Sequence, residues 1–463
     1  MADDTTIQEN PASFRDPSGF VFKKNDGVLR QINKSYSVQY EHLMSSGLYA
    51  NLIEDSLLVA HTELNDLSGF TSEKYKIIEP QPIPFISFPY EWCFSQLKDA
   101  ALLTLEIQKR ALSYGMSLKD ASAYNIQFIG YQPIYIDTLS FEFYPENKPW
   151  VAYRQFCQHF LAPLAVMAKV DINLGVLSQS YIDGLPLELA SHLLPSRTKL
   201  ALGLGSHIHL HARSQNQHAH QPKTVKDYAL SKERLIALLA NLESTVRGLK
   251  LPAQKTVWQD YYENTNYTPQ AAEHKKEVIG NWLTRLKPSS VWDAGANDGT
   301  FSSLSAERGS YTVASDIDPM AVEIAYKKAK DKKATKLLPL IIDITAPSPA
   351  IGWHNTERPA FLKRGTFDVV LCLAFVHHLA IANNIPLHFI AQLFSEQATF
   401  LIIEFVPKED SNAARLLAVR EDIFPEYTAT GFEKEFSHYF SIEKKELVKE
   451  TNRILYLLKK KAS

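Results

Sequence analysis

The sequence has few cysteines, no long apolar run and almost no net charge. Its three cysteines, Cys93, Cys157 and Cys372, are far apart in apolar surroundings, which predicts reduced, buried thiols rather than disulfides or a zinc site. No apolar run reaches the length of a membrane span, and residues 1–17 lack the basic and apolar regions of a leader. We therefore expect a soluble, cytoplasmic protein with no membrane partner and a disordered tail over residues 1–17.

Composition limits the classes of partner and the number of domains. The chain has 49 lysines and arginines against 51 aspartates and glutamates, so no overall positive field recruits nucleic acid. Its 463 residues are 45% hydrophobic, which is enough to fill two or three cores. A change of pattern around Pro252 predicts an α+β domain over residues 18–252 and an α/β domain over residues 253–463.

The first half contains one turn signal and several helical patterns. Asn25-Asp26-Gly27 predicts a hairpin of two antiparallel strands. Apolar spacing predicts helices in four segments: Tyr36–Asp55, Trp92–Tyr114, Pro149–Lys169 and Lys223–Leu249.

Five histidines fall between Ser206 and His220, in a polar, loop-like setting. They are His207, His209, His211, His218 and His220. Alternate histidines could bind zinc or nickel, but no acidic or cysteine ligand accompanies them. We expect solvated histidines in a flexible connection.

In the second half, strand and helix patterns alternate, which predicts a mostly parallel sheet with helices on both faces. The expected strands are Ser290–Ala294, Tyr311–Asp316, Leu337–Asp343, Phe367–Leu373 and Thr399–Phe405, with an antiparallel pair inside Phe440–Leu458. Ahead of them, the aromatic tract Trp258–Tyr267 is expected to pack the two domains together or to wall a substrate.

A tight turn follows the first of these strands. Glycine tolerates positive φ best and asparagine second best, and glycine, which has no Cβ, lets a ligand approach the backbone closely. Acidic residues end the first three strands, at Asp293, Asp316 and Asp343. Ligands of such sheets bind at the carboxyl ends of the strands.

This set resembles the class I S-adenosylmethionine-dependent methyltransferases, whose domain is a Rossmann-like, mostly parallel seven-stranded sheet. The resemblance implies that Asp293 supports the methionine moiety, that Asp316 pairs with the ribose hydroxyls, and that Asp343 meets the adenine amino group. The complete set of expected cofactor-binding residues is Asp293, Ala294, Gly295, Asn297, Gly299, Asp316, Ile317, Asp343, Ile344 and Leu373. A dinucleotide is the competing cofactor, and Asp298 at the helix N-terminus would repel its phosphates.

The fourth strand leads into His377 and His378. The segment resembles the one that brings substrate to the cofactor in many small-molecule methyltransferases. A histidine there can take a proton from an oxygen or nitrogen nucleophile, and either is a candidate base, although such histidines also pack or cap helices. Glu404 could line the acceptor pocket. No Asn-Pro-Pro-Tyr motif and no basic groove are present, which disfavours nucleic acid as the acceptor.

A second resemblance lies in the first half. Asp120, Asn125 and Asp137 have the spacing found in kinase-like phosphotransferases, which implies Asp120 as the catalytic base and Asn125 and Asp137 as magnesium ligands in an ATP site. The segment from Ser18 to Val21 offers a single glycine for the phosphate loop, and Arg30 and Lys34 are imperfect substitutes for the phosphate-pairing lysine. Glu41 is the candidate glutamate that would orient it. Aspartate and asparagine also commonly cap turns and end strands, so Asp120, Asn125 and Asp137 have this purely structural alternative.

The whole chain resembles bacterial methyltransferases related to a rhizobial host-specificity nodulation protein, with an atypical kinase-like domain in front. We expect methyl transfer from S-adenosylmethionine to an oxygen or nitrogen of a small-molecule or glycan-like acceptor. Two alternatives stay open: a bifunctional protein whose first half phosphorylates a hydroxyl with ATP and magnesium, and a pseudokinase scaffold that presents a protein partner to the methyltransferase.

Overall fold

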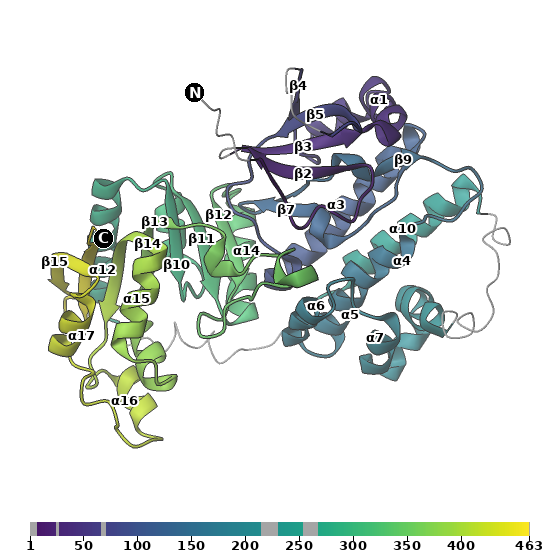
Figure 1. Ribbon diagram of the computed structural model, residues 1–463. Coiled ribbons are helices and arrows are strands. Elements are labelled where there is room, and N and C mark those ends of the chain that lie inside the picture. Colours follow the sequence, from purple (N-terminus) through teal and green to yellow (C-terminus); the bar gives the residue numbers. More distant parts are fainter. Residues whose placement is uncertain (1–6, 25–26, 66–70, 214–229, 253–266, 463) are drawn as a thin grey trace. The chain divides into compact units, whose positions relative to one another are not determined.

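The protein forms two compact units in a computed structural model that describes residues 7–24, 27–65, 71–213, 230–252 and 267–462 (Figure 1). The first unit contains Met1–Phe128, Gln132–Gln254 and Ala350–Pro359, and the second contains Ile129–Tyr131, Lys255–Pro349 and Ala360–Ser463. The main division therefore falls two residues beyond the expected boundary. The sequence did not predict that Ala350–Pro359 would belong to the first unit.

An antiparallel sheet of five strands opens the first unit, in the order β1-β2-β3-β5-β4. Its strands are β1 (Ile7–Glu9), β2 (Gly19–Lys24), β3 (Gly27–Asn33), β4 (His61–Leu64) and β5 (Lys74–Pro80). The predicted hairpin is confirmed, because β2 and β3 pair antiparallel. A Cβ on Gly19 would lie 2.1 Å from the carbonyl oxygen of Gln31, so this strand pair requires glycine there. The expected disordered tail is wrong for residues 7–17, since β1 pairs with β2.

Helices form most of the rest of the first unit. The helical structure predicted over Tyr36–Asp55 is confirmed as two helices, α1 (Ser37–Ser45) and α2 (Leu48–Glu54), separated by Gly47 in the left-handed conformation. The predicted core helix is α3 (Phe94–Ser113), which buries Leu97, Ala101 and Leu105. The later elements are β6 (Met116–Leu118), β7 (Ile126–Ile129), β8 (Gln132–Tyr135), β9 (Phe141–Phe143), α4 (Tyr153–Phe156), η5 (Cys157–Leu161), α5 (Ala162–Lys169), α6 (Leu177–Ser180), α7 (Leu187–Leu193), α8 (Leu202–Leu204), η8 (Gly205–Leu210) and α10 (Lys232–Gly248).

The histidine segment differs from the prediction of a solvated loop. His207 and His209 lie in η8 and are 2% and 4% exposed. His207 hydrogen-bonds with Tyr153 and Asn241, and His209 with Ser191 and Thr198. The loop prediction was wrong because local polarity hid these distant partners. Within the described residues no group of His, Cys, Asp or Glu could hold a metal, while His218 and His220 lie outside them.

A mixed sheet of seven strands is the centre of the second unit, in the order β12-β11-β10-β13-β14-β16-β15. These strands are β10 (Ser290–Ala294), β11 (Tyr311–Asp316), β12 (Leu337–Ile341), β13 (Phe367–Cys372), β14 (Ala398–Phe405), β15 (Phe440–Leu447) and β16 (Ile454–Lys460). The first five are parallel, and β16 and β15 form the predicted antiparallel pair. Strand order reverses at β10, because the chain adds β11 and β12 on one side and then returns to add β13 on the other.

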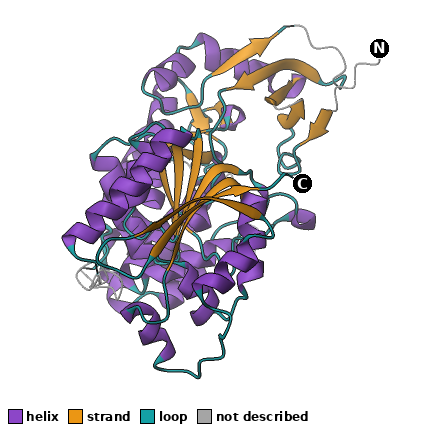
Figure 2. Ribbon diagram, turned by 90° about the vertical axis from the view of Figure 1, so that its left-hand side faces the viewer, coloured by secondary structure: helices purple, strands orange, loops and turns teal. Residues whose placement is uncertain are grey.

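Alternate residues of β10 explain why helices cover both faces of this sheet (Figure 2). Val291 packs in the cluster that contains Ile279 of α12 (Pro269–Leu286) and Leu304 of α13 (Thr300–Ala306). The next residue, Trp292, points to the opposite face and contacts the ring of Phe394 in α15 (Leu387–Gln397). The remaining helices are α14 (Pro319–Asp331), α16 (Ser411–Leu417) and α17 (Ala429–Phe436). No helix in the described part of the chain is long and apolar enough to cross a membrane.

Candidate functional site

The turn after β10 has the backbone that its glycines and asparagine favour. Gly295, Asn297 and Gly299 all have positive φ, at 77°, 48° and 77°. A Cβ on Gly295 would lie 2.9 Å from the ring of Phe375, so this position also requires glycine for space. The turn is tied to the next strand, because the backbone N–H of Asn297 donates to Asp316 Oδ2 over 2.8 Å.

The three predicted aspartates lie at the carboxyl ends of three adjacent strands of the sheet. Asp293 is 2% exposed in β10 and accepts a 2.5 Å hydrogen bond from Ser302. Asp316 ends β11 and accepts the backbone N–H of Asp318 as well as that of Asn297. Asp343, two residues after β12, accepts from the backbone and side chain of Thr345. The structure therefore brings the three carboxyl groups to one edge of the sheet.

The apolar members of the predicted set lie at the same edge. Ile317 is 54% exposed directly after Asp316, which leaves its side chain open to a ligand. Ile344 is partly buried beside Asp343, while Ala294 and Leu373 are buried at the ends of β10 and β13.

Burial raises the pKa of Asp293 to about 7, and the hydrogen bond from Ser302 and the charge of Lys275 only partly oppose that rise. Because the folded pKa lies above the ordinary value, the buried protonated carboxyl stabilises the fold below pH ~4, and this contribution is lost as the pH rises through 7. We expect the unfolding free energy of the second unit to decline over that range and Asp293→Asn to flatten the decline. Urea unfolding at a series of pH values measures both, and equal slopes in the two proteins would contradict the assignment.

Asp298 is less of a barrier to phosphate than its sequence position suggested. Its carboxylate forms an ion pair with Lys328, and it also accepts hydrogen bonds from Thr300. Because Lys328 neutralises part of the charge, repulsion by Asp298 is a weaker argument against a dinucleotide than expected.

The two candidate histidines follow β13 but differ in environment. Ala374 has a φ of 48°, an uncommon conformation for alanine, at the start of this loop. His377 is fully buried, and neither ring nitrogen has a hydrogen-bond partner among the described residues. Burial and the charges of His378, Arg453 and Lys275 hold the pKa of His377 well below its usual range, whereas burial lowers the pKa of the half-buried His378.

A buried ionic cluster at this edge was missed by sequence reasoning, except for Glu404. Glu404 is fully buried at the end of β14, with Lys275 Nζ 2.6 Å from one carboxylate oxygen and the Tyr267 hydroxyl donating to the other. Arg453 is 1% exposed and donates two hydrogen bonds, of 2.7 and 3.0 Å, to Asp410. Despite burial, Lys275 and Arg453 lower the pKa of Glu404 and keep it ionised. Tyr267 belongs to the predicted aromatic tract, whose other members lie outside the described residues.

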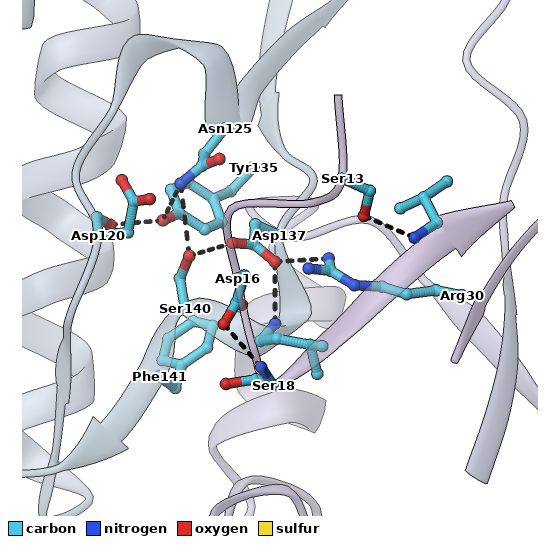
Figure 3. A network of polar contacts seen from close by, with 12 residues as sticks. Ser13, Asp16, Ser18, Arg30, Asp120, Asn125, Tyr135, Asp137, Ser140 and Phe141 are labelled. Atoms are coloured by element: carbon cyan, nitrogen blue, oxygen red, sulfur yellow. Dashed lines mark hydrogen bonds and ion pairs between the residues drawn. The ribbon is translucent and has the colours of Figure 1, made fainter. Parts of the chain in front are cut away.

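In the first unit, the three residues of the expected phosphotransferase site are close together but are held by protein groups (Figure 3). Arg30 forms a 2.5 Å ion pair with Asp137, and both side chains are mostly buried. Asp137 also accepts hydrogen bonds from Ser140 and from the backbone N–H of Leu139. Burial favours a raised pKa for Asp137, but Arg30 and these hydrogen bonds lower it, so the carboxylate is ionised and already paired.

Asn125 and Asp120 are similarly engaged. The Asn125 amide donates to the hydroxyls of Tyr135 and Ser140, and Asp120 accepts the backbone N–H of Ser122 at 2.7 Å. Burial raises the pKa of Asp120.

The other residues expected in the phosphotransferase site do not take the expected positions. Glu41 does not orient Arg30: its carboxylate pairs with Lys76 and accepts from Tyr75 at the surface. Lys34 begins a short turn of 3₁₀-helix after β3, whereas Arg30 inside β3 faces Asp137. The segment before β2 carries Asp16, which accepts from Lys119 and from the backbone of Ser18. A carboxylate therefore lies two residues before the expected phosphate-binding segment, Ser18 to Val21.

A seven-stranded mixed sheet with carboxylates around a glycine turn places the second unit in the class of α/β folds that hold a ligand at the carboxyl edge of the sheet. No family model matches the chain. It is 34% identical over 472 residues to the nodulation protein NoeA of Rhizobium meliloti (strain 1021), covering 98% of each chain. The protein belongs to the NoeA family.

Several solved structures are also similar to parts of the chain. The bifunctional kinase-methyltransferase WbdD is 15% identical over 43% of this chain and 41% of its own, with a TM-score of 0.31. Magnesium protoporphyrin IX methyltransferase from Synechocystis PCC 6803, with bound SAH, is 20% identical over 44% and 92%, with a TM-score of 0.31. The N-methyltransferase NodS from Bradyrhizobium japonicum WM9 is 13% identical over 41% and 98%, with a TM-score of 0.30.

Proposed function

We propose that the second unit is a Rossmann-like, class I methyltransferase domain that transfers a methyl group from S-adenosylmethionine. The observation that carries this proposal is the placement of Asp293, Asp316 and Asp343 at the carboxyl ends of three adjacent strands, around a turn with positive φ at Gly295, Asn297 and Gly299. A single strand-end aspartate is an ordinary cap, but three together around an open turn form a binding edge.

The residues present fit this cofactor by their chemistry. Asp316 accepts one backbone N–H on each oxygen, and each oxygen keeps a further lone pair for a ribose hydroxyl. Asp343 would accept from the adenine amino group, and the exposed side chain of Ile317 would cover the adenine ring. Asp293 would support the methionine moiety. When bound, the cofactor supplies an electrophilic methyl group on a sulfonium, and the protein supplies alignment with the acceptor.

The acceptor is an oxygen or nitrogen of a small or glycan-like molecule in this proposal, and no nucleic acid is involved. Support comes from the position of His377 and His378 after β13 and of Glu404 near the end of β14, at the same edge as the cofactor residues. Either histidine would take the proton that the nucleophile loses.

Calorimetry with S-adenosylmethionine and with its demethylated product tests the assignment. The intact protein should bind both with one site each, and a methyl-transfer screen of metabolite extracts with labelled cofactor should then yield a product. No heat of binding for either compound would overturn the proposal.

For the first unit we propose a kinase-like fold without phosphotransfer. The strand order β1-β2-β3-β5-β4, with a helix pair between β3 and β4, supports the fold. The Arg30–Asp137 pair and the engagement of Asn125 favour an inert site over one that takes ATP and magnesium, because the expected metal ligands are satisfied internally. Such a unit would serve as a scaffold for a protein partner.

We expect millimolar magnesium and ATP to leave the thermal unfolding of the intact protein unchanged, because a ligand that does not bind the folded state cannot stabilise it. Differential scanning calorimetry with and without the nucleotide measures this. A magnesium-dependent upward shift that disappears in Asp137→Asn would instead establish the phosphotransferase alternative.

A further inference from the structure

The buried cluster beside the proposed cofactor edge consists of groups from four parts of the second unit. Tyr267 lies two residues before α12 and Lys275 lies inside it, Glu404 lies near the end of β14, and Arg453 lies just before β16. His377, in the loop after β13, is close enough for the charges of Lys275 and Arg453 to lower its pKa. Glu404 pairs with Leu455 in the sheet register, so the amino end of β16 lies at the carboxyl end of β14. The cluster therefore occupies the edge where an acceptor must meet the methyl group.

The charges in this cluster are already paired. Lys275 neutralises Glu404 over 2.6 Å, and Arg453 holds Asp410 through two hydrogen bonds. Both cations also lie over the Tyr267 ring, at 5.0 Å for Lys275 and 4.5 Å for Arg453. An incoming ammonium would have to enter beside two buried cations whose carboxylates are engaged. Removing a charge from water without a partner is costly, so the cluster selects against a cationic acceptor.

Beside this cluster, the His377 ring has nitrogens that can still form hydrogen bonds. Its ring is fully buried, yet both nitrogens lack a partner in the described part of the chain. Buried polar groups are almost always hydrogen-bonded, so such an exception calls for a ligand. Burial, together with the charges of His378, Arg453 and Lys275, holds the pKa of His377 well below its usual range, so the ring is neutral, and a neutral imidazole nitrogen accepts a hydrogen bond from a hydroxyl.

We propose that this cluster receives an uncharged hydroxyl group whose O–H donates to His377, and that the transfer is therefore O-methylation. The inference rests on the proposed methyltransferase function. In the step, the hydroxyl oxygen forms a bond to the methyl carbon, the sulfur–methyl bond breaks with its electron pair left on sulfur, and the hydroxyl proton passes to His377.

This step leaves the total charge of the site unchanged. Before transfer the sulfonium carries one positive charge and His377 is neutral; afterwards the sulfur is neutral and His377 carries the charge. The surrounding pairs therefore do not have to accommodate an additional buried charge. Protonation of the half-buried His378 next to it, at a ring-centroid distance of 4.2 Å, would add such a charge.

The chemical nature of the labelled product tests the proposal directly. The intact protein is incubated with S-adenosylmethionine carrying a tritiated methyl group and a bacterial metabolite extract, and the product is treated with hot hydriodic acid. Methyl ethers release the label as volatile methyl iodide, whereas methylated amines retain it under the same mild conditions. Release supports O-methylation. Retention overturns this inference alone, while a failure to bind the cofactor would overturn the proposed function itself.

Two histidine variants test the assignment of the proton acceptor. His377→Asn should lower kcat by about 100-fold, with cofactor affinity and KM within about threefold, and should abolish the acidic limb of the pH profile of kcat. His388→Gln, at an exposed position of α15, serves as a control that keeps the wild-type rate. A loss in His378→Asn equal to that in His377→Asn, or an unchanged pH profile in His377→Asn, would overturn the choice of His377. His377→Gln, checked for the same unfolding midpoint, covers the case in which the asparagine variant does not fold.

Discussion

Asp316→Ala is expected to weaken the binding of S-adenosylmethionine by about 100-fold. The Asp316 carboxylate would accept both ribose hydroxyls, and a hydrogen bond to a charged group contributes roughly 1.5–3 kcal/mol. The lower value for both bonds gives about 3 kcal/mol, which is a loss of about 100-fold because about 1.4 kcal/mol corresponds to a tenfold change in affinity. The same variant also removes the acceptor for the backbone N–H of Asn297, so it loosens the glycine turn. Isothermal titration calorimetry measures the loss.

Two variants separate these contributions. Asp316→Asn retains one oxygen for the Asn297 N–H but loses the negative charge and the acceptor for the Asp318 N–H, so it should lose affinity with a smaller fall in the unfolding midpoint than Asp316→Ala. Asp331→Ala removes an exposed aspartate at the end of α14 and should bind as the wild type does. Full binding by Asp316→Ala would remove Asp316 from the site.

Much of the second unit could be predicted from local sequence alone. Its strands are short, bounded by glycine, proline or acidic residues, and alternate with segments of helical period, so β10 and β11 were predicted with their observed bounds. The carboxyl-edge rule then placed Asp293, Asp316 and Asp343 together, because parallel neighbouring strands end at one edge.

The polar partnerships could not be predicted, because they join residues that are distant in sequence. Lys275 and Glu404 are 129 positions apart, and in the sequence Lys275 is one of several charged residues on an amphipathic helix. Only the closing of the sheet by β16 brings Arg453 to the same place. The histidines of η8 were misjudged for the same reason, since their partners Asn241 and Ser191 come from other helices.

The first unit shows how a motif can be present while its chemistry is altered. The spacing of Asp120, Asn125 and Asp137 predicted that they would converge, and they do (Figure 3). Spacing gave no information on the partner of Asp137, which depends on the side-chain direction in β3. Arg30 stands opposite Ile78 in the sheet register and reaches Asp137 with its guanidinium. An arginine in that place supplies a fixed positive charge and a planar fork, which satisfy the carboxylate that a metal would otherwise need.

Lys275→Met is expected to lower the unfolding free energy of the second unit by about 3–5 kcal/mol. Methionine keeps the length of the side chain but leaves Glu404 fully buried with its closest cation gone, and an uncompensated buried charge is strongly destabilising. Arg453, at 3.9 Å from the other carboxylate oxygen, offsets part of the loss. Urea unfolding followed by circular dichroism measures the change.

The double variant Lys275→Met/Glu404→Gln tests whether the loss comes from the unpaired charge. It should recover most of the stability, because the remaining glutamine is neutral and can still accept the Tyr267 hydroxyl. Lys332→Met is the matched control: its partner Glu307 is exposed, and the change should stay within about 0.5 kcal/mol. A loss in Lys275→Met as small as in Lys332→Met would show that Glu404 is not held as an ion in the folded protein. Lys275 would then lack an ionised partner, and Arg453 with Asp410 would be the one remaining ion pair in the argument from engaged carboxylates.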